Sequence, residues 1–244
     1  MEKVKTLGKV YLEKDVLTAA KERLAWIFAH FEAVYLAASG GKDSSVMVQL
    51  ADLVARPLGR RFDVFYIDME AQYAHTIAHI QELKTLPSID RFYHVALPLA
   101  LRNAVSTLQP KWICWDEDER DLWVREMPED AICAANCPWE WFHKGMEFEE
   151  FVKEFAIWYH QEKGVPIACG IGIRADESLN RFSTIAFAQR KTELCGLHWT
   201  TRIADGVYNF YPIYDWRCED IWGAVSQLNF TYNEIYELMY KNGL

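Results

Sequence analysis

The stretch Val34-Tyr35-Leu36-Ala37-Ala38-Ser39-Gly40-Gly41-Lys42-Asp43-Ser44-Ser45 decides the fold of this 244-residue chain. Its first five residues form a short apolar run with a β-branched and an aromatic side chain, which predicts a buried strand over 34–38. The two glycines predict a tight turn, and the polar residues 43–45 are typical of the first turn of a helix. Adjacent glycines leave their backbone N–H groups open to a ligand because no Cβ atom shields them.

The predicted turn has the chemistry of a phosphate site. The first turn of the following helix supplies free N–H groups and a partial positive charge, which attract anions. Lys42 adds a mobile full charge, and the hydroxyl groups of Ser39, Ser44 and Ser45 can donate to phosphoryl oxygens. A glycine pair on its own would indicate only an ordinary turn between a strand and a helix.

The segment Ser39-Gly40-Gly41-Lys42-Asp43-Ser44 resembles the SGGxDS pyrophosphate loop of the adenine-nucleotide α-hydrolase-like superfamily, which includes the ATP pyrophosphatases and the phosphoadenosine-phosphosulfate (PAPS) reductases. It is not a Walker loop, because GxxxxGK(S/T) is absent. The resemblance implies that seven residues bind the nucleotide phosphates: Ser39, Gly40, Gly41, Lys42, Asp43, Ser44 and Ser45. It does not decide which reaction follows.

Four further apolar runs predict the strands 62–67, 92–97, 165–171 and 208–213. Strands joined through helices form parallel βαβ units, whose ligands bind at the carboxyl ends of the strands. We therefore predict one α/β domain over 1–244, with its core over about 33–230. Its sheet is expected to be a doubly wound, mostly parallel, five-stranded Rossmann-like sheet.

Residues 99–146 break this pattern, because five tryptophans are interleaved there with acidic residues. We predict that they leave the sheet as an insertion, either a lid over the site or a surface for a partner. Residues 240–244 place a glycine after a helical stretch, which is typical of a helix C-cap with more chain to follow. A chain truncated at its C-terminal end is therefore expected.

Asp68 and Glu70 follow the second predicted strand, where the superfamily carries its DTG…F-P-E-T element. The match holds at Asp68, Tyr73 and Thr76 and fails at Met69, Glu70, Ala74 and His75. It implies that Ile67 lies against the adenine and that Asp68 faces the phosphates or their Mg²⁺. Two carboxylates two residues apart suit a hard cation, so Asp68 and Glu70 are candidate Mg²⁺ ligands. The alternative is that Asp68 only caps the next helix.

The stretch from Gly170 to Arg181 is similar to the superfamily element G-x-R-x-x-(E/Q)-S-x-x-R. The matching positions are Gly172, Arg174, Glu177, Ser178 and Arg181. The planar guanidinium groups of Arg174 and Arg181 suit phosphate or sulfate oxygens, and Glu177 can hold one of them in position. The alternative is two solvated arginines on a surface helix. A later segment, 211–216, resembles the P-I-x-D-W element and is expected to be structural.

The six cysteines are expected to be reduced, because the chain shows no signal-peptide h-region and no apolar run long enough to cross a bilayer. A cytoplasmic location follows. Cys114, Cys133 and Cys137, with His143, offer four ligands for Zn²⁺ or an iron–sulfur cluster. We favour buried free thiols, because a lone C-x-x-x-C is weak support for a metal site.

Cys195 lies in the stretch 191–198, which resembles the K-x-E-C-G-(I/L)-H tail that carries the nucleophilic cysteine of PAPS reductases. Two departures count against that role. Leu194 is inserted before the cysteine, and the stretch precedes the segment 211–216 instead of following it on a mobile tail. We therefore predict that Cys195 is structural, near the end of a helix over 177–191, and that the protein does not reduce PAPS with thioredoxin.

The net charge of −9 and a pI near 5.3 exclude a general attraction to nucleic acid. The resemblance is strongest to the prophage- and plasmid-associated IbrA-like branch of PAPS reductase-like proteins. It implies a ParB/sulfiredoxin-like protein as partner, because members of that branch tend to be encoded beside one.

Three functions follow from these motifs. The first is an enzyme that binds ATP with Mg²⁺, cleaves the bond between the α- and β-phosphates and adenylates an acceptor, with Lys42, Asp43, Asp68, Arg174 and Arg181 as catalytic residues. The second is a thiol-dependent PAPS reductase. The third is a non-catalytic subunit that senses a nucleotide and regulates a partner.

Overall fold

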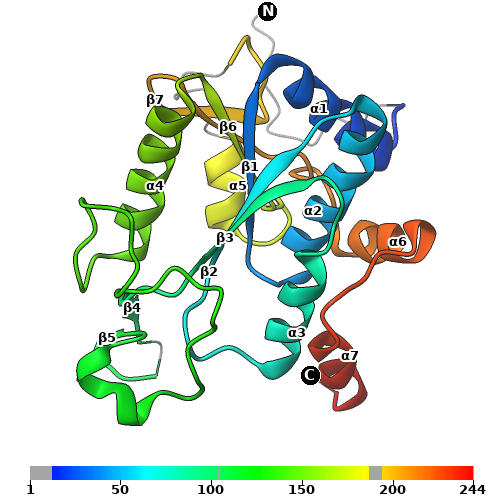
Figure 1. The fold of residues 1–244 in the computed structure, drawn as a ribbon. Helices are drawn as coiled ribbons and strands as arrows, with labels where there is room; N and C mark the ends of the chain where they lie inside the picture. Colours follow the sequence, from blue (N-terminus) through cyan, green and yellow to red (C-terminus); the bar gives the residue numbers. More distant parts are fainter. Residues whose placement is uncertain (1–12, 104, 187–193, 244) are drawn as a thin grey trace, which may run out of the picture.

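The structure, a computed structural model, describes residues 13–103, 105–186 and 194–243. Its centre is a six-stranded sheet with the strand order β3-β2-β1-β6-β8-β7 (Figure 1). The strands are β1 (Ala33–Ala38), β2 (Phe62–Ile67), β3 (Ile89–Val95), β6 (Ile167–Ile171), β7 (Thr200–Ala204) and β8 (Val207–Phe210). Neighbours run parallel except β7 and β8. The predicted doubly wound, mostly parallel sheet is confirmed, with six strands instead of five.

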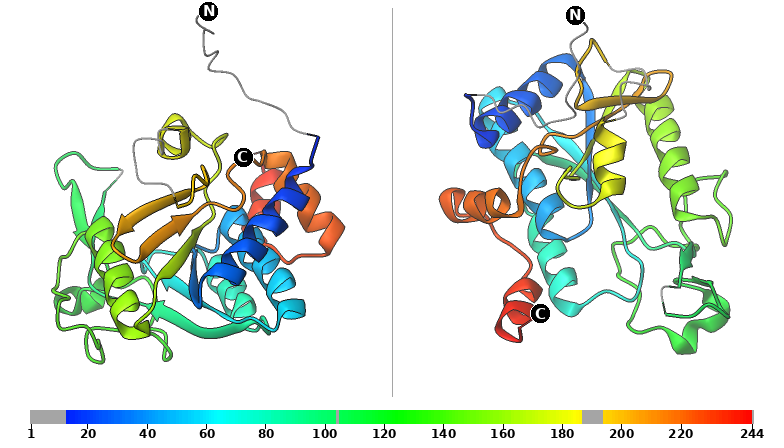
Figure 2. Two further views of the ribbon diagram at one scale, coloured as in Figure 1. Left: turned by 90° about the horizontal axis from the view of Figure 1, so that it is seen from above. Right: turned by 180° about the vertical axis from the view of Figure 1, so that it is seen from behind.

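Helices cover both faces of this sheet (Figure 2). One face carries α1 (Val16–His30), α2 (Lys42–Ala55) and α6 (Cys218–Leu228), and the other carries α4 (Phe148–Lys163). Successive residues of a strand point to opposite faces, so Val34 and Leu36 pack with the first group while Tyr35 packs against α4. Because β1 is covered on both sides, its sequence is apolar throughout.

The strand order reverses beside β1. β2 and β3 lie on one side of β1, whereas β6 and β8 lie on the other. The loops after β1 and β6 therefore meet at the carboxyl edge of the sheet, at the kind of switch point where open α/β sheets bind ligands. Three further helices follow strands or extend the chain: α3 (Ala74–Leu83), α5 (Leu179–Ala186) and α7 (Ile235–Lys241).

The insertion 99–146 lies between β3 and α4. It contains a small hairpin of β4 (Ala100–Arg102) and β5 (Lys111–Ile113) and the 3-10 helix η2 (Glu117–Leu122); another 3-10 helix, η1 (Arg56–Leu58), follows α2. Trp115 and Trp139 of the insertion are buried, and Trp139 packs against Phe151 and Phe155 of α4. These two tryptophans extend the core. Within the described ranges, no helix is long and apolar enough to cross a bilayer.

Candidate functional site at the carboxyl edge

The phosphate loop, residues 39–41, joins β1 to α2 at the carboxyl edge of the sheet. Gly40 has a φ of +73°, in the left-handed region that favours glycine. A Cβ atom at Gly40 would also lie 2.7 Å from Cγ2 of Thr76, the third residue of α3. Gly41 is the N-cap residue of α2. The first glycine is thus required twice, by its backbone angle and by the close approach of α3.

The serine hydroxyl groups have partners within the protein. Ser44 Oγ accepts the backbone N–H of Ser39 at 3.1 Å and donates to the carbonyl oxygen of Gly41 at 3.1 Å. It also lies 2.9 Å from Ser39 Oγ. Ser45 is buried, with its Oγ 2.8 Å from Nε2 of His79. In this arrangement the three hydroxyls hold the shape of the loop, and direct donation to phosphate stays a prediction.

Backbone donors remain available at the start of α2. Among the residues that the structure describes, no protein acceptor takes the N–H groups of Asp43 and Ser44, the second and third residues of the helix. The N–H of Lys42 is taken by the hydroxyl group of Tyr236, at 3.2 Å. Free N–H groups together with the partial positive charge of the helix end form a site for an anion.

Arg174 joins this site from the loop after β6. Its buried guanidinium donates through Nε to Asp43 Oδ1 at 2.8 Å, and Lys42 Nζ lies 3.3 Å from Asp43 Oδ2. A Cβ atom at Gly172 would lie 2.9 Å from the Cα of Ser44, so only glycine lets this loop contact the start of α2. The single carboxylate of Asp43 balances only one of the two cations. A net positive charge therefore remains beside the free N–H groups.

Asn233 and Gln49 attach the C-terminal segment, residues 231–241, to the site. Asn233 Nδ2 donates to the carbonyl oxygen of Gly40 at 3.0 Å and to Thr76 Oγ1 at 2.8 Å. The side chain of Gln49 in α2 accepts the N–H of Thr231 and donates to its carbonyl oxygen, both at 2.8 Å. Sequence reasoning missed these residues, because no motif links positions so distant along the chain.

Asp68, directly after β2, is wholly buried and bound by two basic side chains. Its Oδ2 lies 3.1 Å from Nε2 of His94, and its Oδ1 accepts from a terminal nitrogen of Arg125 and from the N–H of Glu70. Burial by itself raises the pKa of Asp68, but the hydrogen bonds from His94 and Arg125 outweigh it and hold the pKa below its usual value. His94 and Arg125 were not predicted.

Glu70 is also buried, and both of its carboxylate oxygens face the insertion. Oε2 accepts the N–H of Trp115 at 2.7 Å and Oε1 accepts the N–H of Val124 at 3.3 Å. Arg125 Nε donates to the Glu70 carbonyl oxygen at 2.9 Å, and the indole N–H of Trp115 donates to the Asp68 carbonyl oxygen at 2.8 Å. Through these hydrogen bonds, Asp68 and Glu70 attach the insertion to the end of β2.

This arrangement does not fit the predicted Mg²⁺ site. Each of the four carboxylate oxygens of Asp68 and Glu70 already accepts a hydrogen bond, and Asp68 has no exposed surface. In the described part of the chain, no group of three or more His, Cys, Asp or Glu residues is placed to hold a metal ion. The helix-cap alternative is wrong, because α3 begins at Ala74 with Tyr73 as its N-cap residue.

Among the residues that the structure describes, neither Arg181 nor Ile67 forms a hydrogen bond or an ion pair with the phosphate loop. Arg181 Nε lies 3.7 Å from Glu177 Oε2, and both side chains are close to half exposed. This pair matches the surface alternative for Arg181. Arg174 is buried and paired with Asp43, and its contact with phosphate or sulfate oxygens stays a prediction. Ile67, the last residue of β2, packs in the core on the α4 side of the sheet. Its contact with an adenine stays a prediction.

The three cysteines proposed as metal ligands have different surroundings. Cys114 is buried, donates to the carbonyl oxygen of Leu97 at 3.3 Å and has a pKa raised to about 12 by burial. Burial also raises the pKa of Cys137, which is half-buried like Cys133. A raised pKa disfavours the thiolate that a metal would need.

Cys195 is exposed, with a φ of +53°, in the turn before β7. It is therefore not packed into a core, and a structural role for its side chain is not seen. The helix α5 is described as far as Ala186, and residues 187–193, which include Lys191 and Glu193 of the tail-like stretch, lie outside the described residues. Thr200 of β7 pairs with Phe210 at the carboxyl end of β8, so Cys195 lies toward the same edge as the phosphate loop.

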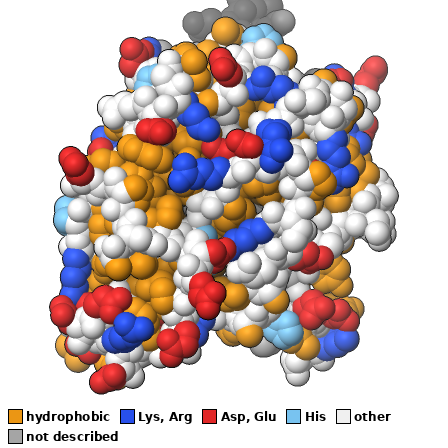
Figure 3. Space-filling model, viewed as in Figure 1, with side chains coloured by type: hydrophobic (Ala, Val, Ile, Leu, Met, Phe, Trp, Pro, Cys, Tyr) orange, Lys and Arg blue, Asp and Glu red, His pale blue; other side chains and the backbone are white. Residues whose placement is uncertain are grey.

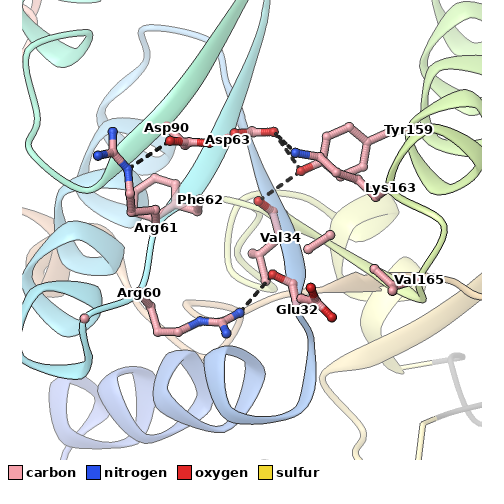
Figure 4. Close-up of a pocket in the computed structure, with 12 residues that line it drawn as sticks. Glu32, Val34, Arg60, Arg61, Phe62, Asp63, Asp90, Tyr159, Lys163 and Val165 are labelled. Atoms are coloured by element: carbon pink, nitrogen blue, oxygen red, sulfur yellow. Dashed lines mark hydrogen bonds and ion pairs between the residues drawn. The ribbon is translucent and has the colours of Figure 1, made fainter.

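A cavity of about 370 Å³ lies elsewhere, near the amino ends of β1 and β2 (Figure 4). Four of its charged side chains form two ion pairs, and Arg60 donates to the backbone carbonyl oxygens of Phe31 and Glu32. Arg61 pairs with Asp90 at 3.0 Å, and Lys163 pairs with Asp63 at 3.0 Å. None of the predicted site residues lines this cavity. The face shown in Figure 3 mixes acidic and basic side chains and presents no large basic patch.

Residues 33–107 and 124–242 match the family model described as the phosphoadenosine phosphosulfate reductase domain. The gap in this match falls in the insertion. The uncharacterized protein YbdN of Escherichia coli (strain K12) is 41% identical over 244 residues, which cover 98% of this chain. The chain spans 58% of the length of that relative. The predicted superfamily is thereby confirmed.

The solved structures that resemble this protein have low sequence identity to it. The PAPS reductase of Candida auris, in a phosphate complex, is 15% identical with a TM-score of 0.49 and covers 95% of this chain and 94% of its own. The FMN adenylyltransferase of Candida glabrata, in complex with ATP, is 16% identical with a TM-score of 0.46. The match covers 93% of this chain and 62% of that structure's chain. With TM-scores below 0.5, these likenesses say nothing about what this chain binds.

Proposed function

Because the chain belongs to the phosphoadenosine phosphosulfate reductase domain family, we propose that it binds ATP at the phosphate loop and transfers the adenylyl group to an acceptor. An oxygen of the acceptor attacks the α-phosphorus, the bond between the α-phosphorus and the bridging oxygen breaks, and pyrophosphate leaves. The loop 39–41 and the start of α2 hold the leaving pyrophosphate.

The observation that carries this proposal is the ion cluster of Lys42, Asp43 and Arg174. Asp43 draws Lys42 from α2 and Arg174 from the loop after β6 to one point, beside the free N–H groups of Asp43 and Ser44. Cations fixed beside a leaving pyrophosphate stabilise the charge that develops on it. Asp43 acts as a positioning residue, because its carboxylate would repel phosphate and instead orients the two cations.

Mg²⁺ and a partner protein stay predictions. Asp68 and Glu70 are held by hydrogen bonds to Arg125, His94 and the insertion, so no step is assigned to a metal ion at these carboxylates. A ParB/sulfiredoxin-like partner rests only on the resemblance of the sequence. Both are open to direct measurement once nucleotide binding has been established.

The proposal is tested with labelled ATP and labelled PAPS in separate incubations. We expect ATP to bind and to yield pyrophosphate when an acceptor is supplied, and Lys42→Ala to reduce both. The matched control is Lys153→Ala, which removes an exposed lysine from α4, remote from the loop. Binding of ATP without either product would favour the nucleotide-sensing subunit. An absence of ATP binding to the parent protein would refute the proposal.

A second candidate function, thiol-dependent PAPS reduction, is favoured by the exposure of Cys195 toward the same edge of the sheet. Its thiolate would attack the sulfur of PAPS, the nucleotide would leave with the bridging oxygen, and a dithiol reductant would release sulfite. This function requires sulfite release that Cys195→Ser abolishes and the control Cys133→Ser leaves intact. The same assay tests the prediction from the sequence that the protein does not reduce PAPS with thioredoxin.

A further inference from the structure

The C-terminal segment 231–241 lies against the phosphate loop, and its helix α7 stands beside α3 (Figure 1). The Tyr236 hydroxyl oxygen accepts the N–H of Lys42 at 3.2 Å. The ammonium group of Lys42 lies 5.5 Å from the centroid of the Tyr236 ring. Tyr236 thus engages both the backbone donor and the side-chain charge of the residue expected to meet phosphate.

The Tyr236 hydroxyl oxygen lies at the start of α2, where a free helical N–H group would otherwise be open to an anion. Lys42 is the first residue of α2, and its N–H has no partner within the helix. A Cβ atom placed on Gly41 would lie 3.4 Å from the Tyr236 hydroxyl oxygen, so that oxygen sits directly over the glycine of the loop. An oxygen that accepts this N–H does what a phosphate oxygen would do.

The rest of the segment is anchored independently of Tyr236. Asn233 is buried and bonded to Gly40 and Thr76, and Gln49 holds both backbone groups of Thr231. Tyr236 itself is half-buried, and its ring meets Trp222 edge to face at 5.8 Å between centroids. Residues 231–233 can therefore stay in place while α7 and Tyr236 move away.

We propose that Tyr236 is an internal occupant of the phosphate loop, and that the phosphates of the nucleotide bind by displacing it. The inference rests on the proposed nucleotide binding at this loop. A neutral hydroxyl is exchanged for a phosphate oxygen at the Lys42 N–H, and the Lys42 ammonium exchanges an aromatic ring for a full negative charge. Tyr236 lowers the apparent affinity of the loop for the nucleotide, because the hydrogen bond between its hydroxyl oxygen and the Lys42 N–H must break before phosphate binds.

The test compares Tyr236→Phe with Tyr240→Phe in calorimetric titrations with ATP and with pyrophosphate. Both substitutions remove one phenolic hydroxyl from α7, but Tyr240 is 84% exposed and, within the described part of the chain, forms no hydrogen bond with the loop. Loss of one ordinary hydrogen bond predicts ATP binding tighter by about two- to tenfold in Tyr236→Phe, and unchanged binding in Tyr240→Phe. Hydrogen exchange of residues 234–241 should accelerate when ATP is added to the parent protein.

Weaker or unchanged binding in Tyr236→Phe would overturn the inference, as would slower exchange of residues 234–241 with ATP. Lys42→Ala separates this failure from failure of the proposed function. If the parent binds ATP, Lys42→Ala loses binding and Tyr236→Phe is unchanged, the loop binds nucleotide and only the displacement is wrong. If neither the parent nor Tyr236→Phe binds ATP or pyrophosphate, both proposals fall.

Discussion

Asp68 is wholly buried, and Arg125 balances its charge in place of solvent. Removing one partner of a buried pair leaves the other without compensation, which costs more than the pair itself contributes. We predict that Asp68→Asn lowers the free energy of unfolding by about 3 kcal/mol. The control Asp205→Asn breaks the exposed pair with Arg202 and should cost less than about 0.5 kcal/mol. Urea denaturation measures both, and equal effects would contradict the assignment.

The same carboxylate predicts a dependence of stability on pH. Hydrogen bonds from His94 and Arg125 hold the pKa of Asp68 below its ordinary value, against the effect of burial. A carboxylate with a lowered pKa stabilises the fold fully above its ordinary value near 3.9, and this contribution is lost as the pH falls through the lowered value. Stability should therefore fall more steeply below about pH 4 in the parent than in Asp68→Asn. Parallel curves would show that Asp68 does not contribute.

Replacing Gly40 would cause both backbone strain and a steric clash, whereas replacing Gly59 would cause backbone strain alone. A comparison of the two substitutions therefore separates these effects. Both have a positive φ, but a Cβ atom on Gly59 meets nothing within 4 Å, whereas one on Gly40 meets Thr76 at 2.7 Å. Gly59→Ala should destabilise the protein by about 1 kcal/mol through strain. Gly40→Ala should cost about 1 to 3 kcal/mol more and weaken ATP binding, because the loop must shift. Thermal unfolding and calorimetry test the pair.

Local motifs predicted the strand, the glycine turn and the helix start around the loop 39–41, and Arg174 after a later strand, because each of these features depends on a few consecutive residues. The partners of these groups lie far along the chain. Arg125 reaches Asp68 from the insertion, and Tyr236 reaches Lys42 from the C-terminal segment. Two acidic residues after a strand can bind a cation or can hold a neighbouring loop through hydrogen bonds. The sequence pattern is the same in both cases, and only the fold distinguishes the two roles.

Asp68 and Glu70 hold the insertion in place through hydrogen bonds. Glu70→Gln would place an amide N–H₂ against the N–H of Trp115 or Val124, two donors that need acceptors. We predict that hydrogen exchange over 115–125 accelerates at least several-fold in Glu70→Gln, while β1 and β2 stay protected. Glu119→Gln in η2, whose carboxylate is exposed, should change nothing. Uniform acceleration across the sheet would indicate global destabilisation instead.

The architecture of the whole molecule was predictable except at one edge. Five apolar runs marked the parallel strands, because strands covered on both faces are apolar throughout. β7 escaped prediction because Thr200–Ala204 is an edge strand whose last three residues are half-buried or exposed, so it carries no apolar run. The edge strand does not alter the switch point between β1 and β6, so the site predicted there stays a prediction at the same point of the fold.

Binding at the switch point should stabilise the whole molecule, since a ligand that binds only the folded state adds its free energy of binding to that of folding. ATP at 100 times its dissociation constant adds about 2.7 kcal/mol, which for a chain of this length raises the unfolding temperature by about 5 to 10 °C. AMP lacks the β- and γ-phosphates that the loop is proposed to hold, so at the same concentration it should raise the temperature far less. Lys42→Ala should reduce the ATP shift toward that of AMP. Equal shifts for ATP and AMP in the parent would show that the β- and γ-phosphates add no binding energy, which would rule out the pyrophosphate role of the loop.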